Sequence, residues 1–147
     1  MVIEAATQTD YYTLLESHIL KPANLHQVFP ARASVLPNIA TGYSGSASML
    51  KADGRMRLDP SSEWTGGGLT TNPTMLVEFY SQLANGKIVA PSSFQQMVTS
   101  GWSDPQRTSR YGFGMFVRDH YISHGGLWPG YRSYVVHSFA ENLTIAL

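Results

Sequence analysis

The 147-residue sequence has no cysteine, no excess charge of either sign and no long apolar run. The lack of cysteine excludes a disulfide framework and thiolate metal sites, although it does not identify the compartment. Ten Lys and Arg balance ten Asp and Glu, so no excess charge draws the chain toward nucleic acid or an anionic membrane. No run is long enough for a membrane span, and the first residues lack the basic and apolar regions of a signal peptide. We therefore expect a small-molecule ligand, with no nucleic-acid partner and no membrane span.

Helical patterns occupy the first two thirds of the chain. Apolar side chains recur every three or four residues, and N-cap residues, Pro and Asn-Gly pairs mark the helix ends. The start of the chain, residues 1–6, is typical of the end of an earlier helix. The other predicted helices are residues 11–20, capped by Thr9-Asp10 and stopped by Lys21-Pro22; residues 73–84, capped by Asn72 and stopped by Asn85-Gly86; and a shorter one after Pro91, capped by Ser92 or Ser93.

Strand patterns dominate the end of the chain, where polar and apolar residues alternate with period two. Residues 28–37 carry two prolines and indicate a loop. The predicted strands are a hairpin over 46–58 that turns at Asp53-Gly54, then residues 111–117, a short 121–123, 131–139 and 143–147. The predicted order is therefore helices first and antiparallel strands last, and 147 residues are enough for one compact domain.

Six short motifs follow one another along the whole chain. No one of them is specific, because a His before two glycines, for instance, often ends an ordinary strand. In order and spacing, however, they resemble the class C β-lactamase, D,D-carboxypeptidase and serine esterase group. The motifs are Ile19-Leu20-Lys21-Pro22, Ala40-Thr41-Gly42-Tyr43, Gly67-Gly68-Leu69-Thr70-Thr71, Tyr111-Gly112-Phe113-Gly114, His124-Gly125-Gly126 and Gly130-Tyr131-Arg132-Ser133.

The resemblance implies a β-lactamase/transpeptidase-like α/β fold, with an antiparallel sheet backed by helices. It implies acyl-enzyme hydrolysis of a β-lactam, a D-Ala-D-Ala peptide or a small ester by a serine nucleophile, without a cofactor or metal. Members are often exported or periplasmic, but the sequence itself indicates no compartment.

The same resemblance assigns the candidate site residues. His124 takes the catalytic role of the motif's first residue, which orients the substrate and tunes the proton relay. Gly125 and Gly126 let the substrate backbone approach the strand closely, and the backbone N–H of Leu127 is an oxyanion donor. Trp128 and Tyr131 are candidate cleft walls, and ordinary packing accounts for these two aromatics equally well.

The nucleophile of the group is a Ser in Ser-x-x-Lys at the start of a helix. The one such match, Ser48-Met49-Leu50-Lys51, comes after the Ala-x-Gly-Tyr motif instead of before it, and Asp53-Gly54 follows at once. On a strand, positions 48 and 51 point to opposite faces about 10 Å apart, so the amine cannot activate the hydroxyl. We therefore predict that residues 1–147 form a single partial domain, the truncated later half of a β-lactamase-like domain, and that the chain alone is inactive. The alternative is a non-catalytic binding or scaffolding domain derived from that fold.

Two other chemistries fit the sequence less well. His120 and His124 have the spacing of a helical zinc pair, but no Glu follows His120, and in a strand the rings lie about 13 Å apart. Gly66-Gly67-Gly68 precedes a helix without the Gly-Lys-Ser/Thr of a phosphate cradle. We predict no metal site and no phosphate site.

An incomplete sheet leaves one edge and an apolar face uncovered. We therefore expect a homodimer or a domain-swapped oligomer that forms through the exposed sheet edge.

Overall fold

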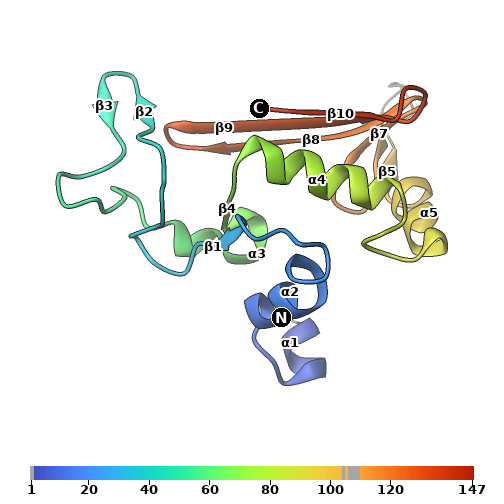
Figure 1. The fold of residues 1–147 in the computed structure, drawn as a ribbon, viewed down its shortest axis with the longest axis horizontal. Helices are drawn as coiled ribbons and strands as arrows, with labels where there is room; N and C mark the ends of the chain where they lie inside the picture. Colours follow the sequence, from blue (N-terminus) through green and yellow to red (C-terminus); the bar gives the residue numbers. More distant parts are fainter. Residues whose placement is uncertain (1, 104, 106–109) are drawn as a thin grey trace. The chain divides into compact units, whose positions relative to one another are not determined.

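A computed structural model describes residues 2–103, 105 and 110–147 (Figure 1). The contacts divide these residues into two compact units. Unit 1 comprises residues 1–72 and 127–132, and unit 2 comprises residues 73–126 and 133–147. None of the described helices combines the length and the hydropathy that a membrane crossing requires.

Unit 1 begins with short helices. α1 (Val2–Thr7) precedes α2 (Tyr11–Leu15), which continues as a π-helical turn, η1 (Glu16–Leu20). The predicted cap is confirmed, because the Asp10 carboxylate accepts a hydrogen bond from the Thr13 backbone N–H at 2.9 Å. The Arg32 guanidinium donates to the same carboxylate at 2.8 Å, and these hydrogen bonds lower the pKa of Asp10 to about 2.

Short strand pairs follow in unit 1. β1 (Phe29–Pro30) pairs with β4 (Leu69–Thr70), so the expected loop over 28–37 contains a two-residue strand. β2 (Tyr43–Ser44) pairs with β3 (Ala47–Ser48), and farther along a single bridge joins Leu50 to Met56. The predicted 46–58 hairpin therefore turns where expected but is reduced to one bridge. Before β4 lie the 3-10 helix η2 (Pro60–Glu63) and the one-turn helix α3 (Trp64–Gly67), which the sequence patterns did not predict.

The tip of the hairpin formed by β8 (Tyr121–Trp128) and β9 (Tyr131–Ser138) also belongs to unit 1 and packs on the loop that contains Gly42. A Cβ at Gly42 would lie 2.5 Å from the carbonyl oxygen of Gly130 and 2.7 Å from the Tyr131 ring, so only glycine permits this approach. The Tyr131 hydroxyl donates to the Ala40 carbonyl at 2.9 Å. The core beside it contains buried Ala31, Leu36 and Met56, with Ile39, Leu50, Trp128 and Tyr131 against them.

Unit 2 contains a six-stranded antiparallel sheet in the order β10-β9-β8-β7-β6-β5. The long central strands β8 and β9 form a hairpin, and β10 pairs with β9 from Leu143↔Ser138 to Ala146↔Val135. The strands are β5 (Trp102–Ser103), β6 (Arg110–Tyr111), β7 (Phe116–Arg118), β8 (Tyr121–Trp128), β9 (Tyr131–Ser138) and β10 (Leu143–Ala146).

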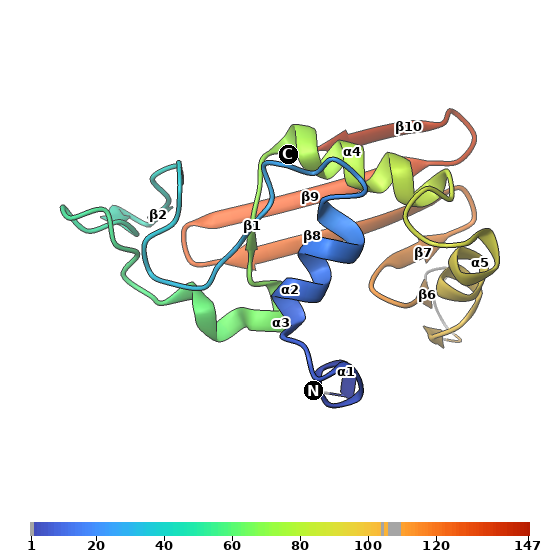
Figure 2. The ribbon, with the colours of Figure 1, turned by 60° about the horizontal axis from the view of Figure 1, so that its bottom comes forward.

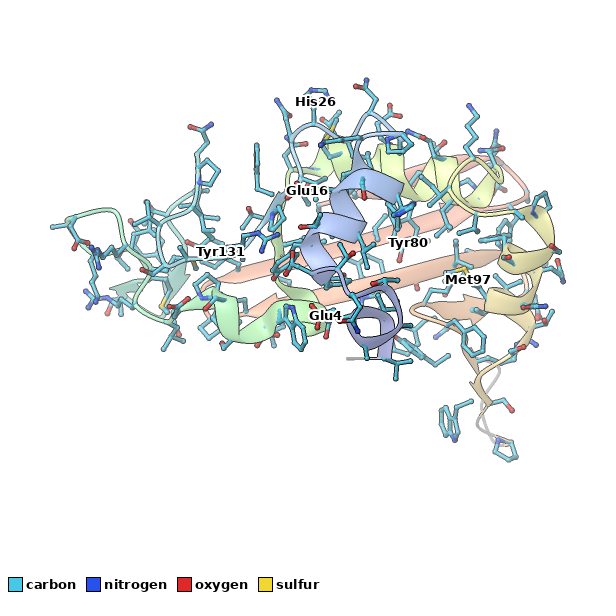
Figure 3. All side chains as sticks on the ribbon, turned by 90° about the horizontal axis from the view of Figure 1, so that it is seen from below. Glu4, Glu16, His26, Tyr80, Met97 and Tyr131 are labelled. Carbon is cyan, nitrogen blue, oxygen red and sulfur yellow. The ribbon has the colours of Figure 1, made fainter. Side chains whose placement is uncertain are left out.

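Two helices of unit 2 pack on this sheet. α4 (Pro73–Ala84) lies along the strands in Figures 1 and 2, and it packs against β10. α5 (Pro91–Thr99) follows it. Figure 3 shows Tyr80 of α4 and Met97 of α5 over the strands, and both belong to the core of this unit. The buried members of that core are Tyr80, Leu83, Met115, Val117, Ile122 and Val135.

Three details of unit 2 differ from the sequence-based expectation. The predicted 111–117 strand is broken into β6 and β7, because the Gly112 N–H bonds to the Met115 carbonyl at 2.8 Å and closes a turn. The predicted 121–123 strand extends to Trp128, because pairing with β9 keeps the glycines extended. The cap of α5 is Ala90 and not Ser92 or Ser93, because Pro91 already occupies the first helical turn.

Candidate functional site

The predicted substrate-facing motif lies on β8. One side of β8 is hydrogen-bonded to β9, whereas on the other side the pairing with β7 ends at Phe116↔Ser123. Figure 2 shows β8 and β9 continuing past the end of β7. From His124 onward, therefore, the β7 side of β8 is an open edge in the sense that no described strand pairs with it.

The His124 side chain is half-buried and belongs to a small aromatic cluster. Its Nε2 lies 2.9 Å from the Tyr111 hydroxyl, a hydrogen-bond distance. Phe116 flanks both rings, with its centroid 4.8 Å from that of Tyr111 and 6.1 Å from that of His124. The structure thus adds Tyr111 to the site. In the sequence, Tyr111 was noted only as part of the Tyr-Gly-x-Gly motif. Its contact with His124 depends on the register of three strands and was not predicted.

Gly125 and Gly126 are exposed and differ in what surrounds them. A Cβ at Gly125 would meet the Tyr134 ring at 3.5 Å, which is ordinary van der Waals contact. A Cβ at Gly126 would lie 2.5 Å from the Ser133 hydroxyl oxygen, so that side chain would have to move. The fold itself therefore does not require glycine at position 125.

The other three predicted residues lie at the hairpin tip. The Leu127 side chain is 80% exposed. Trp128 and Tyr131 pack against the unit 1 core, and the Tyr131 hydroxyl is bonded to the Ala40 carbonyl. The Nε1 of Trp128 is the one buried side-chain polar atom without a hydrogen-bond partner among the described residues.

The Ser48–Lys51 match does not lie on a helix. Ser48 lies on β3, and its hydroxyl donates to the Leu50 carbonyl at 2.8 Å. Lys51 lies outside any helix, in the turn closed by its N–H to the Arg55 carbonyl at 2.8 Å. The prediction that these residues do not form a helical Ser-x-x-Lys pair is confirmed.

The histidines other than His124 have separate environments. His120 lies in the turn before β8, so it does not share a helical turn with His124. His137 is buried on β9, with Nδ1 2.8 Å from the Thr144 hydroxyl, and desolvation lowers its pKa. Within the described residues, no three His, Cys, Asp or Glu side chains are grouped as metal ligands.

An open hollow of about 360 Å³ lies within unit 1, lined by residues between Glu16 and Pro30. None of the predicted site residues lines it.

Comparisons with known proteins agree with this fold. The family model described as Beta-lactamase matches residues 1–147. A putative penicillin-binding protein, PbpX of Bacillus subtilis (strain 168), is 26% identical over an alignment that takes in 96% of this chain and 34% of the relative. The chain therefore belongs to the β-lactamase family.

Solved structures of low sequence identity share the fold. A D-stereospecific amidohydrolase from Streptomyces sp. matches with a TM-score of 0.81 at 24% identity, over 99% of this chain and 45% of that chain. A penicillin-binding protein from Bacillus halodurans matches with a TM-score of 0.79 at 16% identity, over 99% of this chain and 46% of that chain. A D-amino acid amidase from Ochrobactrum anthropi SV3, complexed with L-phenylalanine amide, matches with a TM-score of 0.76 at 21% identity, over 99% of this chain and 45% of that chain.

The fold is thus the mixed α/β, β-lactamase/transpeptidase-like fold that the sequence predicted. The chain spans about a third of the length of the curated relative and under half of the length of these solved structures.

Proposed function

We propose that this chain supplies the substrate-binding strand of a serine hydrolase that acts on a small amide, β-lactam or ester. In this proposal the serine attacks the acyl carbon and the amine or alcohol leaves. Water then hydrolyses the acyl-enzyme. The chain contributes β8 to that reaction and does not contribute the nucleophile.

The observation that carries the proposal is the open edge of β8 from His124 onward. An extended ligand that lies along this edge adds a strand to the sheet, and its backbone groups pair with those of β8. Gly125 supports this reading, because its surroundings leave room for a Cβ and the packing of the fold does not explain a glycine there. A close ligand does explain it.

His124 and Leu127 take the two polar roles. The half-buried His124 ring orients the ligand from the same strand, with Nε2 already bonded to Tyr111. The backbone N–H of Leu127, just beyond the glycines, serves as one oxyanion donor. Loss of such a donor costs on the order of 2.7–4 kcal/mol in the transition state.

Trp128 and Tyr131 have a supporting role in this proposal. Their rings pack in the unit 1 core, and the bond from Tyr131 to Ala40 holds the tip of the hairpin. We propose that they support the wall of the cleft indirectly, through the position of the hairpin.

The nucleophile comes from a part of the enzyme outside these 147 residues. Support for this comes from Ser48, whose hydroxyl is engaged by the Leu50 carbonyl on a short strand with no lysine beside it in a helical turn. The chain alone is then expected to bind ligand without turning it over.

The substrate class follows from the balanced charge and from the relatives. With ten cationic and ten anionic side chains, the chain has no net charge that would attract a highly charged substrate. D-amino acid amides are the first class to test, because a D-amino acid amidase and a D-stereospecific amidohydrolase share the fold. β-Lactams, D-Ala-D-Ala peptides and small esters follow.

The test is an amide NMR titration of the 147-residue chain with D-phenylalanine amide. We expect the largest shifts at the Gly125, Gly126 and Leu127 amides, and about fivefold weaker binding in Gly125→Ala with unchanged thermal stability. Gly66→Ala is the matched control, because a Cβ there has ordinary room. Shifts that avoid β8 altogether would contradict the proposal.

Turnover assays separate catalysis from binding. A chromogenic β-lactam, a p-nitrophenyl ester and D-phenylalanine amide should show no turnover with the chain alone. Activity abolished by Ser48→Ala would overturn our exclusion of that serine. Binding that is never accompanied by turnover, even after a nucleophile-bearing segment of a family member is added, would favour a non-catalytic binding domain.

A further inference from the structure

Three neighbouring strands each contribute one ring to a cluster around His124. Tyr111 comes from β6, Phe116 from β7 and His124 from β8. The Tyr111 and His124 centroids lie 5.9 Å apart at 60°, and Phe116 meets the Tyr111 ring edge-on at 79°. Tyr111 and Phe116 are also cross-strand partners in the β6–β7 register. His124 therefore has neighbouring rings whose position the sheet itself determines.

The backbone around Tyr111 is held closely against α5. The Phe113 N–H donates to the Met97 carbonyl at 2.9 Å, at the end of that helix. A Cβ at Gly112 would overlap this same carbonyl oxygen, and a Cβ at Gly101 would overlap the carbonyl oxygen of Tyr111. Because the backbone is packed this closely, the point from which the Tyr111 side chain extends is fixed. Its hydroxyl therefore lies beside His124 at a defined place.

A neutral imidazole has one N–H donor and one acceptor nitrogen, and the hydrogen bond at one nitrogen determines where the proton lies. A phenol hydroxyl is a good hydrogen-bond donor, and the 2.9 Å distance allows the Tyr111 O–H to donate to Nε2 of His124. The proton of the neutral ring is then on Nδ1. Among the described residues no group is hydrogen-bonded to Nδ1, and the ring is half-exposed.

We propose that Tyr111 is a positioning residue that holds neutral His124 as the Nδ1–H tautomer, so that Nδ1–H is the donor presented to a carbonyl or carboxylate oxygen of the ligand. This inference rests on the proposed function for the identity of the ligand, but not for the tautomer. Phe116 keeps the imidazole plane in place beside the hydroxyl. The assigned ligand chemistry is a hydrogen-bond acceptor next to the acyl group, as in an amino acid amide.

The tautomer is tested by long-range proton–nitrogen NMR of the ¹⁵N-histidine-labelled chain, above the pH at which histidines titrate. We expect His124 of the wild type to show an unprotonated Nε2 and a protonated Nδ1. In Tyr111→Phe the signal should shift toward the Nε2–H form, which free histidine favours. A protonated Nε2 in the wild type would overturn the proposal, and this measurement needs no variant to fold.

Tyr121→Phe is the matched control, since it removes a hydroxyl from the same strand as His124, three residues away. It should leave the His124 tautomer unchanged. If Tyr121→Phe and Tyr111→Phe change the spectrum equally, the effect is a general disturbance of the sheet and the positioning role is wrong.

Titration with D-phenylalanine amide links the tautomer to binding. We expect Tyr111→Phe to weaken binding about fivefold, the value of one hydrogen bond, and Tyr121→Phe to leave it unchanged. If the wild type shows the predicted tautomer but the ligand shifts no resonance on β8, the result counts against the proposed function and leaves the positioning role intact. Ligand binding on β8 that Tyr111→Phe does not weaken would overturn the positioning role alone.

Discussion

At the scale of single residues, the His137 ring and the Trp128 Nε1 atom of the β8–β9 hairpin are both buried but have opposite hydrogen-bonding states. His137 has a partner in the Thr144 hydroxyl, whereas Trp128 Nε1 is buried without one. An unpaired buried donor costs about 1–3 kcal/mol, so the two residues respond differently to substitution.

Trp128→Phe is expected to change the free energy of unfolding by less than about 1 kcal/mol, because it removes an unpaired N–H while keeping most of the ring. Trp128→Ala is the comparison, and it should cost about 3–5 kcal/mol through the cavity it leaves. Chemical denaturation of both variants checks this. A Phe variant as unstable as the Ala variant would mean that the indole N–H has a partner in solution.

His137 predicts a pH dependence of stability. Burial lowers the pKa of His137 in the folded chain below its ordinary value of 6.5, so the unfolded chain takes up this proton at higher pH than the folded chain. The contribution to stability is therefore present above pH 6.5 and is lost as the pH falls through the lower folded pKa. Thermal unfolding measured between pH 8 and 5 should show this decline.

The variant for that measurement is His137→Gln, which should flatten the slope. The Asp10 carboxyl affects the stability in a separate, lower pH range. Its pKa is lowered to about 2 from 3.8, so its contribution is lost only as the pH falls through that range. An unchanged slope in His137→Gln would mean that another group causes the decline.

At the scale of the elements, α4 has sequence signals for both its ends and its buried face. Pro73 begins it, and Gly86, with φ of 69°, follows its last turn. The buried side chains of this helix are Met75, Tyr80 and Leu83. The local sequence signals and the burial of one face in the core therefore both favour a helix at this position.

Leu83→Ala should lower the free energy of unfolding by about 2–5 kcal/mol, because Leu83 is 3% exposed in the core of unit 2. Glu78→Ala on the exposed face of the same helix should stay within about 0.5 kcal/mol of the wild type. Urea denaturation followed by circular dichroism measures both. Equal losses would show that α4 is not packed on the sheet as described.

At the scale of the whole molecule, β10 forms one edge of the six-stranded sheet. Leu143, Ile145 and Leu147 are 52%, 56% and 64% exposed, and they alternate with residues that face α4. An uncovered strand edge with apolar side chains beside it favours pairing with another strand.

The expected outcome is a dimer or a domain-swapped oligomer in light scattering at high micromolar concentration. Ile145→Lys should shift the population toward monomer, because a buried lysine would be left unpaired in the interface. Val2→Lys is the control, since Val2 is 86% exposed on α1, away from the sheet edge in sequence. A wild-type monomer at that concentration contradicts the prediction.

The sequence by itself predicted the longer helices, the long strands near the end of the chain and the family. Asp10, Pro73 and Gly86 act within one helical turn of their own position, so their effect is visible in sequence. The alternation from Tyr131 to Ser138 predicts β9 because its two faces have different environments. The two-residue strands, such as β1 and β4, have too few residues for any period and become visible only through their pairing.

Only the tertiary structure decided what surrounds the candidate site. The open edge of β8 exists because β7 begins only at Phe116, opposite Ser123, and the partner of His124 is Tyr111 because β6, β7 and β8 are paired in one particular register. Register depends on contacts between residues far apart in the chain, and no local pattern encodes it. The sequence located the His-Gly-Gly strand, and the sheet determined which of its groups remain free to meet a ligand.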